Sequence, residues 1–157
     1  MDKTSVIHEN IRFLGCTLWS YINNHDKRTG SKKTFFSIFF LVETTLGDYY
    51  EIDLKKNEKI SKVKVEDTNL FHEIELKWLK SEISKAEENG EIIVVLSHHA
   101  PIFEGVVDPK YIGSALGYAF SSYLNNILGG NIVLWCFGHT HYSSDQMINS
   151  MICLFRC

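Results

Sequence analysis

Apolar residues in this chain of 157 residues gather into short, unbroken runs that polar segments separate. The runs at 92–96 and 131–137 have the composition of strands that are buried on both faces. We expect a further strand at 11–19, where β-branched and aromatic residues gather, and one at 35–43, which is too short and too aromatic to favour a helix. A last strand is expected over 147–155.

Two segments carry apolar residues at the three- and four-residue spacing of an amphipathic helix. The first should begin at the capping pair Asp67-Thr68 and extend to about Glu88, because Asn89-Gly90 supplies a stop. Its expected apolar face consists of Phe71, Ile74, Trp78, Leu79, Ile83 and Ala86. The second helix should extend from Ser114 to Leu128, before a pair of glycines.

The segments between these elements are polar and are expected to form loops. They are 23–33, 102–113 and the charged connector 55–67, which has room for a short edge strand around 60–65.

The order of the elements predicts an α/β fold in which a sheet is flanked by helices. In a strand–helix–strand unit the two strands run parallel, so the carboxyl ends of 92–96 and 131–137 should lie at the same edge of the sheet. His98 follows the first of these strands, and His139 and His141 follow the second after Gly138. The three imidazoles should therefore converge, although about forty positions separate them in the sequence.

Three converging imidazoles are a plausible site for zinc, iron or manganese, since histidine nitrogens are common ligands of these ions. The single residue between His139 and His141 allows the pair to bind one ion or two neighbouring ions. The alternative is that these histidines only cap strand ends with hydrogen bonds.

Composition narrows the classes of partner. The formal net charge of −3, with lysines interspersed among glutamates, predicts neither a nucleic-acid partner nor binding to an acidic membrane surface. The four cysteines lack a Cys-x-x-Cys spacing and are expected to be reduced thiols. The first ten residues are polar, and the longest apolar run is far below the ~20 residues of a membrane helix, so a soluble, cytoplasmic protein is expected.

Several motifs carry a resemblance to a known family. Val95-Leu96-Ser97-His98-His99-Ala100-Pro101 and Gly138-His139-Thr140-His141 resemble the last two motifs of the calcineurin-like metallophosphoesterases. Phe13-Leu14-Gly15-Cys16-Thr17-Leu18-Trp19, Gly47-Asp48-Tyr49-Tyr50-Glu51-Ile52 and Glu66-Asp67-Thr68 with the following His72 and Trp78-Leu79 are similar to one branch of that family, in the same order.

The resemblance implies a fold, a cofactor and roles for four residues. The fold would be part of a four-layer α-β-β-α sandwich with a mixed sheet and flanking helices. The complete enzyme would hold two divalent metal ions, Mn, Fe or Zn, about 3.5–4 Å apart. His98 and His139 would bind one ion and His141 the other, while His99 would bind substrate or would have a purely structural role.

The earlier motifs of the family are Asp-x-His, Gly-Asp-x-x-Asp and Gly-Asn-His-Asp/Glu, which supply the bridging aspartate and the histidine that protonates the leaving group. Asn24-His25-Asp26 and Gly47-Asp48-Tyr49-Tyr50-Glu51 imitate two of them, but in reversed order and downstream of the Thr-Leu-Trp segment. We therefore interpret them as a loop and a turn. Residues 1–157 would then be the carboxyl-terminal half of a metallophosphoesterase domain, with no catalytic residue assigned beyond its metal ligands.

These observations predict metal-dependent hydrolysis of a phosphoester, impaired in this chain by the missing bridging carboxylate. The first alternative is a non-catalytic remnant or interaction module, since half of a two-sheet sandwich exposes an apolar sheet face that invites a partner or self-association. The second is a mononuclear zinc hydrolase that uses His98, His139 and His141. The sequence names neither the substrate nor the metal.

Overall fold

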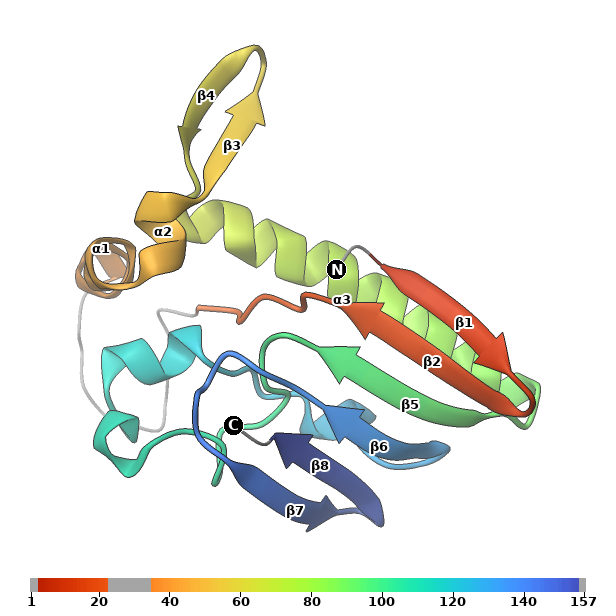
Figure 1. Cartoon of the computed structure of the whole chain (residues 1–157). Helices are drawn as coiled ribbons and strands as arrows, with labels where there is room; N and C mark the ends of the chain where they lie inside the picture. Colours follow the sequence, from red (N-terminus) through yellow and green to blue (C-terminus); the bar gives the residue numbers. More distant parts are fainter. Residues whose placement is uncertain (1–2, 23–34, 156–157) are drawn as a thin grey trace.

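The computed structural model of the chain describes residues 3–22 and 35–155 (Figure 1). Six strands form one mixed sheet in the order β1-β2-β5-β6-β8-β7. The strands are β1 (Thr4–His8), β2 (Ile11–Cys16), β5 (Ile92–Ser97), β6 (Ile132–Cys136), β7 (Ser144–Ile148) and β8 (Met151–Phe155). The predicted mixed sheet with flanking helices is confirmed. The 23–33 segment, with Asn24-His25-Asp26, lies outside the described residues.

The four central strands run parallel, and the two outer strands are antiparallel to their neighbours. β5 and β6 pair in parallel, with Val94 opposite Leu134 and Leu96 opposite Cys136, as predicted for these two strands. Their carboxyl ends, together with that of β2, therefore lie at one edge of the sheet.

One face of the sheet forms the main core. Leu14, Val95, Trp135 and Cys153 lie side by side in the register of four neighbouring strands, and all are fully buried. The helix α3 (Val65–Glu88) packs along β2 and β5, behind β1 and β2 in the view of Figure 1, and buries Leu79, Ile83 and Ala86 in this core.

Helix α3 confirms the predicted helix with two changes. It begins at Val65 because Asp67 is the third helical residue, whose carboxylate accepts the backbone N–H of Lys64 at 3.1 Å. Ile74 was assigned to the apolar face but is exposed, because five residues turn it about 140° around the axis from Leu79. Glu75 and His72 lie on the same side of the helix as Leu79 and are buried there instead. The helix ends at Asn89-Gly90, as expected.

The strand expected at 35–43 is wrong, because these residues belong to the helix α1 (Phe35–Thr45). Ile38, Phe39 and Val42 are buried whereas Phe40 is exposed, which is helical spacing and breaks the alternation of a strand. α1 leads into the short helix α2 (Gly47–Glu51), where a turn was expected. Together with residues of α3 and the 115–119 turn, they form a second buried cluster around Val42, Tyr49 and Val65.

The helix expected over 114–128 is also wrong. Only two 3-10 turns form there, η2 (Ala115–Ala119) and η3 (Asn125–Ile127). Between them the backbone is extended and pairs with the segment after β5: the N–H of Ser122 donates to Ala100 O at 3.0 Å, and that of Leu124 donates to Pro101 O at 3.0 Å. These bonds replace the helical ones, while the apolar positions still reach the core.

The remaining differences concern two hairpins and one short turn. The edge strand expected around 60–65 is β4 (Lys59–Lys62), which pairs with β3 (Asp53–Lys56) in a separate two-stranded sheet. The strand expected at 147–155 is a hairpin of β7 and β8, since Asn149 and Ser150 adopt positive φ angles of 49° and 66° and turn the chain back. The expected loop at 102–113 contains the 3-10 turn η1 (Pro109–Tyr111). Within the described residues, no helix is both long and apolar enough to cross a bilayer.

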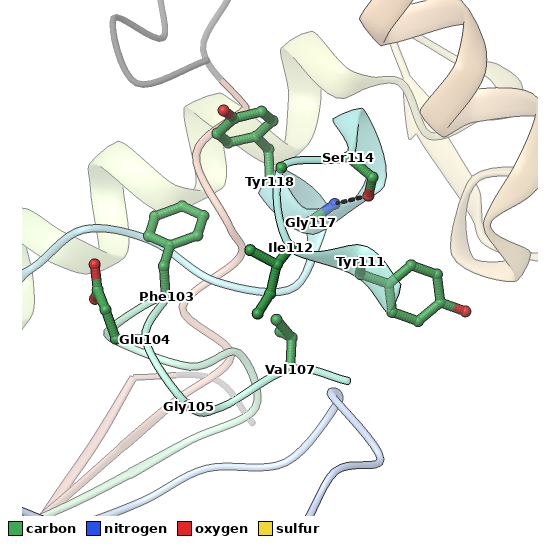
Figure 2. Close-up of a pocket in the computed structure, with 10 residues that line it drawn as sticks. Phe103, Glu104, Gly105, Val107, Tyr111, Ile112, Ser114, Gly117 and Tyr118 are labelled. Atoms are coloured by element: carbon green, nitrogen blue, oxygen red, sulfur yellow. Dashed lines mark hydrogen bonds between the residues drawn. The ribbon is translucent and has the colours of Figure 1, made fainter. Parts of the chain in front are cut away.

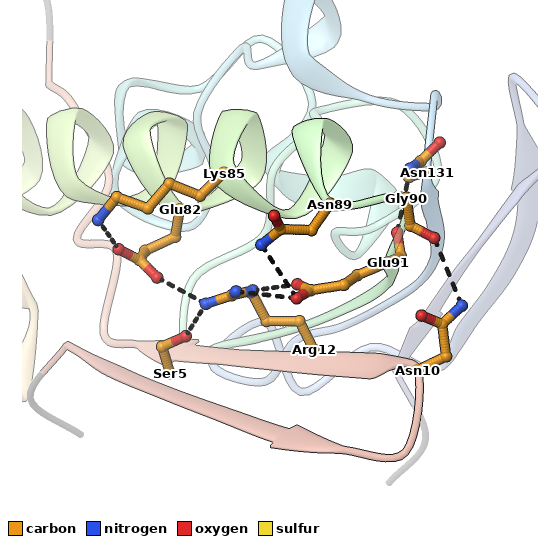
Figure 3. Close-up of polar contacts among 9 residues, drawn as sticks. All are labelled: Ser5, Asn10, Arg12, Glu82, Lys85, Asn89, Gly90, Glu91 and Asn131. Atoms are coloured by element: carbon orange, nitrogen blue, oxygen red, sulfur yellow. Dashed lines mark hydrogen bonds and ion pairs between the residues drawn. The ribbon is translucent and has the colours of Figure 1, made fainter.

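A buried ion cluster fastens the opposite edge of the sheet (Figure 3). The Arg12 guanidinium of β2 donates to Glu91 at 2.6 Å, to Glu82 of α3 at 3.1 Å and to Ser5 of β1 at 3.0 Å. The bond from Arg12 lowers the pKa of Glu91. This cluster joins α3 to the amino ends of the central strands and leaves their carboxyl ends free for other chemistry.

The second face of the sheet is apolar and partly exposed. Its register rows contain Ile11 and Ile92; Phe13, Val94, Leu134 and Ile152; and Gly15, Leu96, Cys136 and Leu154. Ile92 and Ile152 expose 39% and 40% of their surface, respectively. An apolar sheet face of this kind normally packs against another layer.

Candidate metal centre

Three histidines lie where β5 and β6 end. His98 and His99 follow β5 directly, and His139 follows β6 after Phe137 and Gly138. The backbone N–H groups of His98 and His99 both donate to Thr17 O beyond β2, at 3.1 and 3.2 Å. The N–H of Gly138 donates to His98 O at 2.9 Å. The ends of the three strands are thereby held together, and their side chains share one site.

The imidazole rings are in direct contact. His139 Nδ1 and His98 Nε2 are 3.2 Å apart, and the rings of His99 and His139 stack with their centroids 4.0 Å apart. One ring nitrogen from each of the three residues lies within 4.8 Å of the other two. Two imidazoles on one tetrahedral zinc ion would place their nitrogens about 3.3 Å apart, close to the spacing of His98 and His139.

The site favours neutral imidazoles. Burial, then the neighbouring His98, lowers the pKa of His139 to about 4. Burial also lowers the pKa of His98, and it lowers that of His99 well below the usual value, with His139 as the second cause. A neutral ring offers a lone pair on one nitrogen, which is the form that binds a metal ion.

Two buried nitrogens in this cluster lack a hydrogen bond. They are His99 Nε2 and His139 Nε2, which have no partner among the described residues, although the backbone of Ala119 lies close enough to raise the pKa of both rings. Unpaired buried nitrogens are costly unless a ligand satisfies them. A divalent transition-metal ion fits the facing pair of His98 Nε2 and His139 Nδ1, because neutral imidazoles are ligands that zinc, iron and manganese accept, and the two unpaired Nε2 atoms are left for other partners.

The site's backbone is strained at the predicted residues. His139 and His141 adopt positive φ angles of 63° and 49°, which residues other than glycine rarely adopt. Such conformations persist where the surroundings impose them, and they occur often at binding sites.

His99 is held by its surroundings more firmly than the other two rings. Its Nδ1 lies 2.8 Å from Ser20 Oγ, and the ring of Trp19 is 5.1 Å from it. On the β6 side, Trp135 Nε1 donates to Ser97 Oγ at 2.9 Å, and Ser97 Oγ donates to the carbonyl of His99 at 2.7 Å. His99 is therefore buried and fixed, while His98 is exposed.

The segment after β2 that carries Trp19 and Ser20 is fastened to α3. The buried Glu75 carboxylate accepts the N–H of Leu18 at 2.6 Å, and the imidazole Nδ1–H of His72 donates to the carbonyl of Trp19. Burial raises the pKa of Glu75 and lowers that of His72. The resemblance had included His72, but nothing in the sequence pointed to Glu75.

Of the four predicted site residues, the structure brings His98, His99 and His139 into one cluster. His141 is exposed and is not in that cluster, but its charge lowers the pKa of His98 and His139, so it lies within electrostatic range of both. Asp48 of α2 has the opposite effect and raises the pKa of both rings. Its stretch was interpreted only as a turn, and no role at the site was expected for it.

Ser20 was missed by sequence reasoning. The signal was present, since it directly follows the Thr-Leu-Trp segment of the resemblance, but its partner His99 is seventy-nine positions away. Only the parallel pairing of β2 with β5 brings the two together.

The chain is similar in sequence to known proteins. The chain is 30% identical over 150 residues to the uncharacterized protein L509 of Acanthamoeba polyphaga mimivirus. The match covers 92% of this chain but 48% of that relative, so the chain spans about half the length of the curated protein it matches. No solved structure matches the chain. The model of the calcineurin-like phosphoesterases matches residues 8–143, which include every histidine of the cluster, and the chain therefore belongs to the calcineurin-like phosphoesterase family.

Proposed function

We propose that this chain forms part of the active site of a metal-dependent phosphoester hydrolase. In this proposal His98 and His139 bind one divalent ion, His141 binds a second, and His99 lines the site of the substrate phosphoryl group. The observation that carries the proposal is the 3.2 Å spacing of His139 Nδ1 and His98 Nε2 at the ends of two adjacent parallel strands. A bound divalent ion would polarise the phosphoryl group and supply a hydroxide at neutral pH.

The chain's own residues would prepare the site for that ion. The depressed pKa values keep His98, His99 and His139 neutral at pH 7, so metal binding need not displace protons from them. The buried, fixed ring of His99 can orient an oxygen of the substrate through Nε2, its nitrogen without a partner among the described residues.

A carboxylate that bridges two ions is the group this site needs for full activity. In the described part of the chain, the cluster of candidate ligands consists of three histidines and contains no carboxylate. We therefore expect this chain alone to bind metal weakly and to hydrolyse phosphoesters slowly.

Hydrolysis of p-nitrophenyl phosphate and bis-p-nitrophenyl phosphate with added Mn²⁺, Fe²⁺ or Zn²⁺ tests the proposal, together with metal affinity measured by calorimetry. His98→Ala and His139→Ala should each lower metal affinity by more than about 100-fold, since loss of a ligand's hydrogen-bond partner alone costs about 10–100-fold. His8→Ala is the matched control, since His8 lies exposed on β1 far along the sheet and should leave the affinity unchanged. Equal metal affinity in all three variants would exclude the proposed site, whereas rapid, histidine-dependent turnover would show that no further carboxylate is needed.

A mononuclear zinc hydrolase is the second candidate. The observation in its favour is that the described ligand cluster is a single group of three imidazoles, the donor set of several one-zinc sites, although it contains His99 where the sequence had predicted His141. Metal analysis separates the two candidates: one tightly bound zinc per chain favours the mononuclear site, and two ions per chain, reduced to one in His141→Ala, favour the dinuclear site.

A further inference from the structure

A cavity of about 490 Å³ lies beside the segment that follows His98 and His99 (Figure 2). Its walls come from the 103–107 loop, the turn η1 and the turn η2, and include Phe103, Val107, Tyr111, Ile112 and Tyr118. The volume falls within the range of pockets that bind small organic molecules.

The walls of this cavity are suited to a flat, uncharged group. The rings of Phe103 and Tyr118 meet edge to face with their centroids 5.8 Å apart, so an aromatic surface is already in place. Among the described residues that line the cavity, Glu104 is the only charged one, and no basic side chain is present. The nearby cation of Lys110 is paired with Asp108 at 3.0 Å and does not line the cavity. A phosphate group would therefore find no counter-charge here, and Glu104 disfavours any anion.

Aromatic contacts connect the cavity to the histidine cluster. Tyr111, in the cavity wall, lies with its ring centroid 5.1 Å from that of Phe120, and Phe120 lies 5.6 Å from the ring of His139. Two successive ring contacts thus separate the cavity from the candidate metal centre, a distance on the order of 10 Å.

We infer that this cavity binds the uncharged aromatic part of the phosphoester's organic group, while the phosphoryl group lies at the histidines. This inference rests on the proposed function for the phosphoryl end. Binding of an aromatic ring in the cavity can be tested separately, without metal. The substrate class it names is an ester with an aromatic ring several bonds from phosphorus and no second phosphate.

A substitution that blocks the opening of the cavity gives the sharpest test. Ile112 is 69% exposed, so Ile112→Trp should fold normally and still place an indole over the opening of the cavity. Ile60→Trp is the matched control, because Ile60 is 71% exposed and lies on the β3–β4 hairpin. In Figure 1 this hairpin lies apart from the 103–118 segment, which lines the cavity. Circular dichroism would verify that both variants keep the fold.

The first probe is 2-naphthol, measured by calorimetry without metal. The wild-type chain and Ile60→Trp should bind it equally, and Ile112→Trp should bind it about tenfold more weakly. Absence of binding to the wild type, or equal binding by both tryptophan variants, would overturn the inference.

The second probe is a pair of phosphates, 4-phenylbutyl phosphate and butyl phosphate, measured with Zn²⁺ present. The phenyl group should strengthen binding to the wild type and to Ile60→Trp but not to Ile112→Trp. The two proposals can be disproved separately. If the proposed function is wrong, His98→Ala and His139→Ala will have the metal affinity of the wild type, while 2-naphthol binding stays intact. Equal binding of the two phosphates by the wild type would overturn the extended-substrate inference.

Discussion

The imidazole rings of His99 and His139 stack at a centroid distance of 4.0 Å, with Ser20 holding one ring and the left-handed backbone of residue 139 aiming the other. Two charged imidazolium rings would repel each other at this distance, and burial makes their charge more costly still. The native fold therefore depends on at least one of the two rings being neutral.

The pH dependence of stability follows from this stack. The folded-state pKa values of His98, His99 and His139 are all below 6.5, so between about pH 4 and pH 6.5 the unfolded chain binds more protons than the folded one. The free energy of unfolding, measured by urea titration after chelator treatment, should rise over this window and level off above it. His139→Asn should flatten the rise, whereas His8→Asn should not. A wild-type stability that is constant from pH 4 to pH 7 would contradict the neutral stack.

Glu75 is expected to support the site through the backbone of the segment after β2. Glu75→Ala leaves the buried N–H of Leu18 without an acceptor, which should cost about 1–3 kcal/mol of unfolding free energy. Glu75→Gln keeps an oxygen in place and should recover most of that loss. Glu73→Ala, at an exposed position of the same helix, is the control and should change stability by less than about 0.5 kcal/mol. Thermal melts of the four proteins decide the matter, and an equal loss in Glu75→Ala and Glu73→Ala would refute the supporting role.

His141 offers a way to separate strain from binding. Its φ of 49° suits glycine, so His141→Gly should raise the free energy of unfolding by about 1 kcal/mol. His8→Gly, on the extended strand β1, should instead lower it by about 0.5–1 kcal/mol. If His141 binds the second ion, as we propose, the more stable His141→Gly variant should also bind one ion fewer. A variant that is no more stable would indicate that the backbone at this position carries no strain.

The strands that position the site could be predicted because their sequences leave few alternatives. An apolar run such as 92–96 is too short for a buried helix. The connecting helix that led to the parallel prediction does not form, but a connection as long as the one between β5 and β6 still lets the two strands run parallel. His98 and His139 follow directly from that pairing. The stacking of His99 on His139 does not, because it depends on the backbone angle at residue 139 and on Ser20, which lies far away in the sequence.

The two segments that were predicted wrongly fail for different reasons. At 35–43 the apolar run is compatible with either type of element, and burial of Phe39 with Val42 beside α2 and α3 decides for a helix. At 114–128 the helical spacing is real, but Ala100 and Pro101 take the backbone hydrogen bonds that a helix would use. Such tertiary competition cannot be read from local periodicity.

The partly exposed sheet face leads to the last prediction. The side chains of Ile92 and Ile152 lie on this face, in the rows that also contain Ile11 and Phe13, and an apolar surface of this kind is expected to associate. The isolated chain should therefore elute from size-exclusion chromatography as an oligomer, and the double variant Ile92→Lys with Ile152→Lys should shift it toward the monomer. Ile60→Lys adds the same charge on the β3–β4 hairpin and should leave the elution volume unchanged. A wild-type chain that stays monomeric at high concentration would show that this face needs no partner, and it would weaken the alternative of an interaction module.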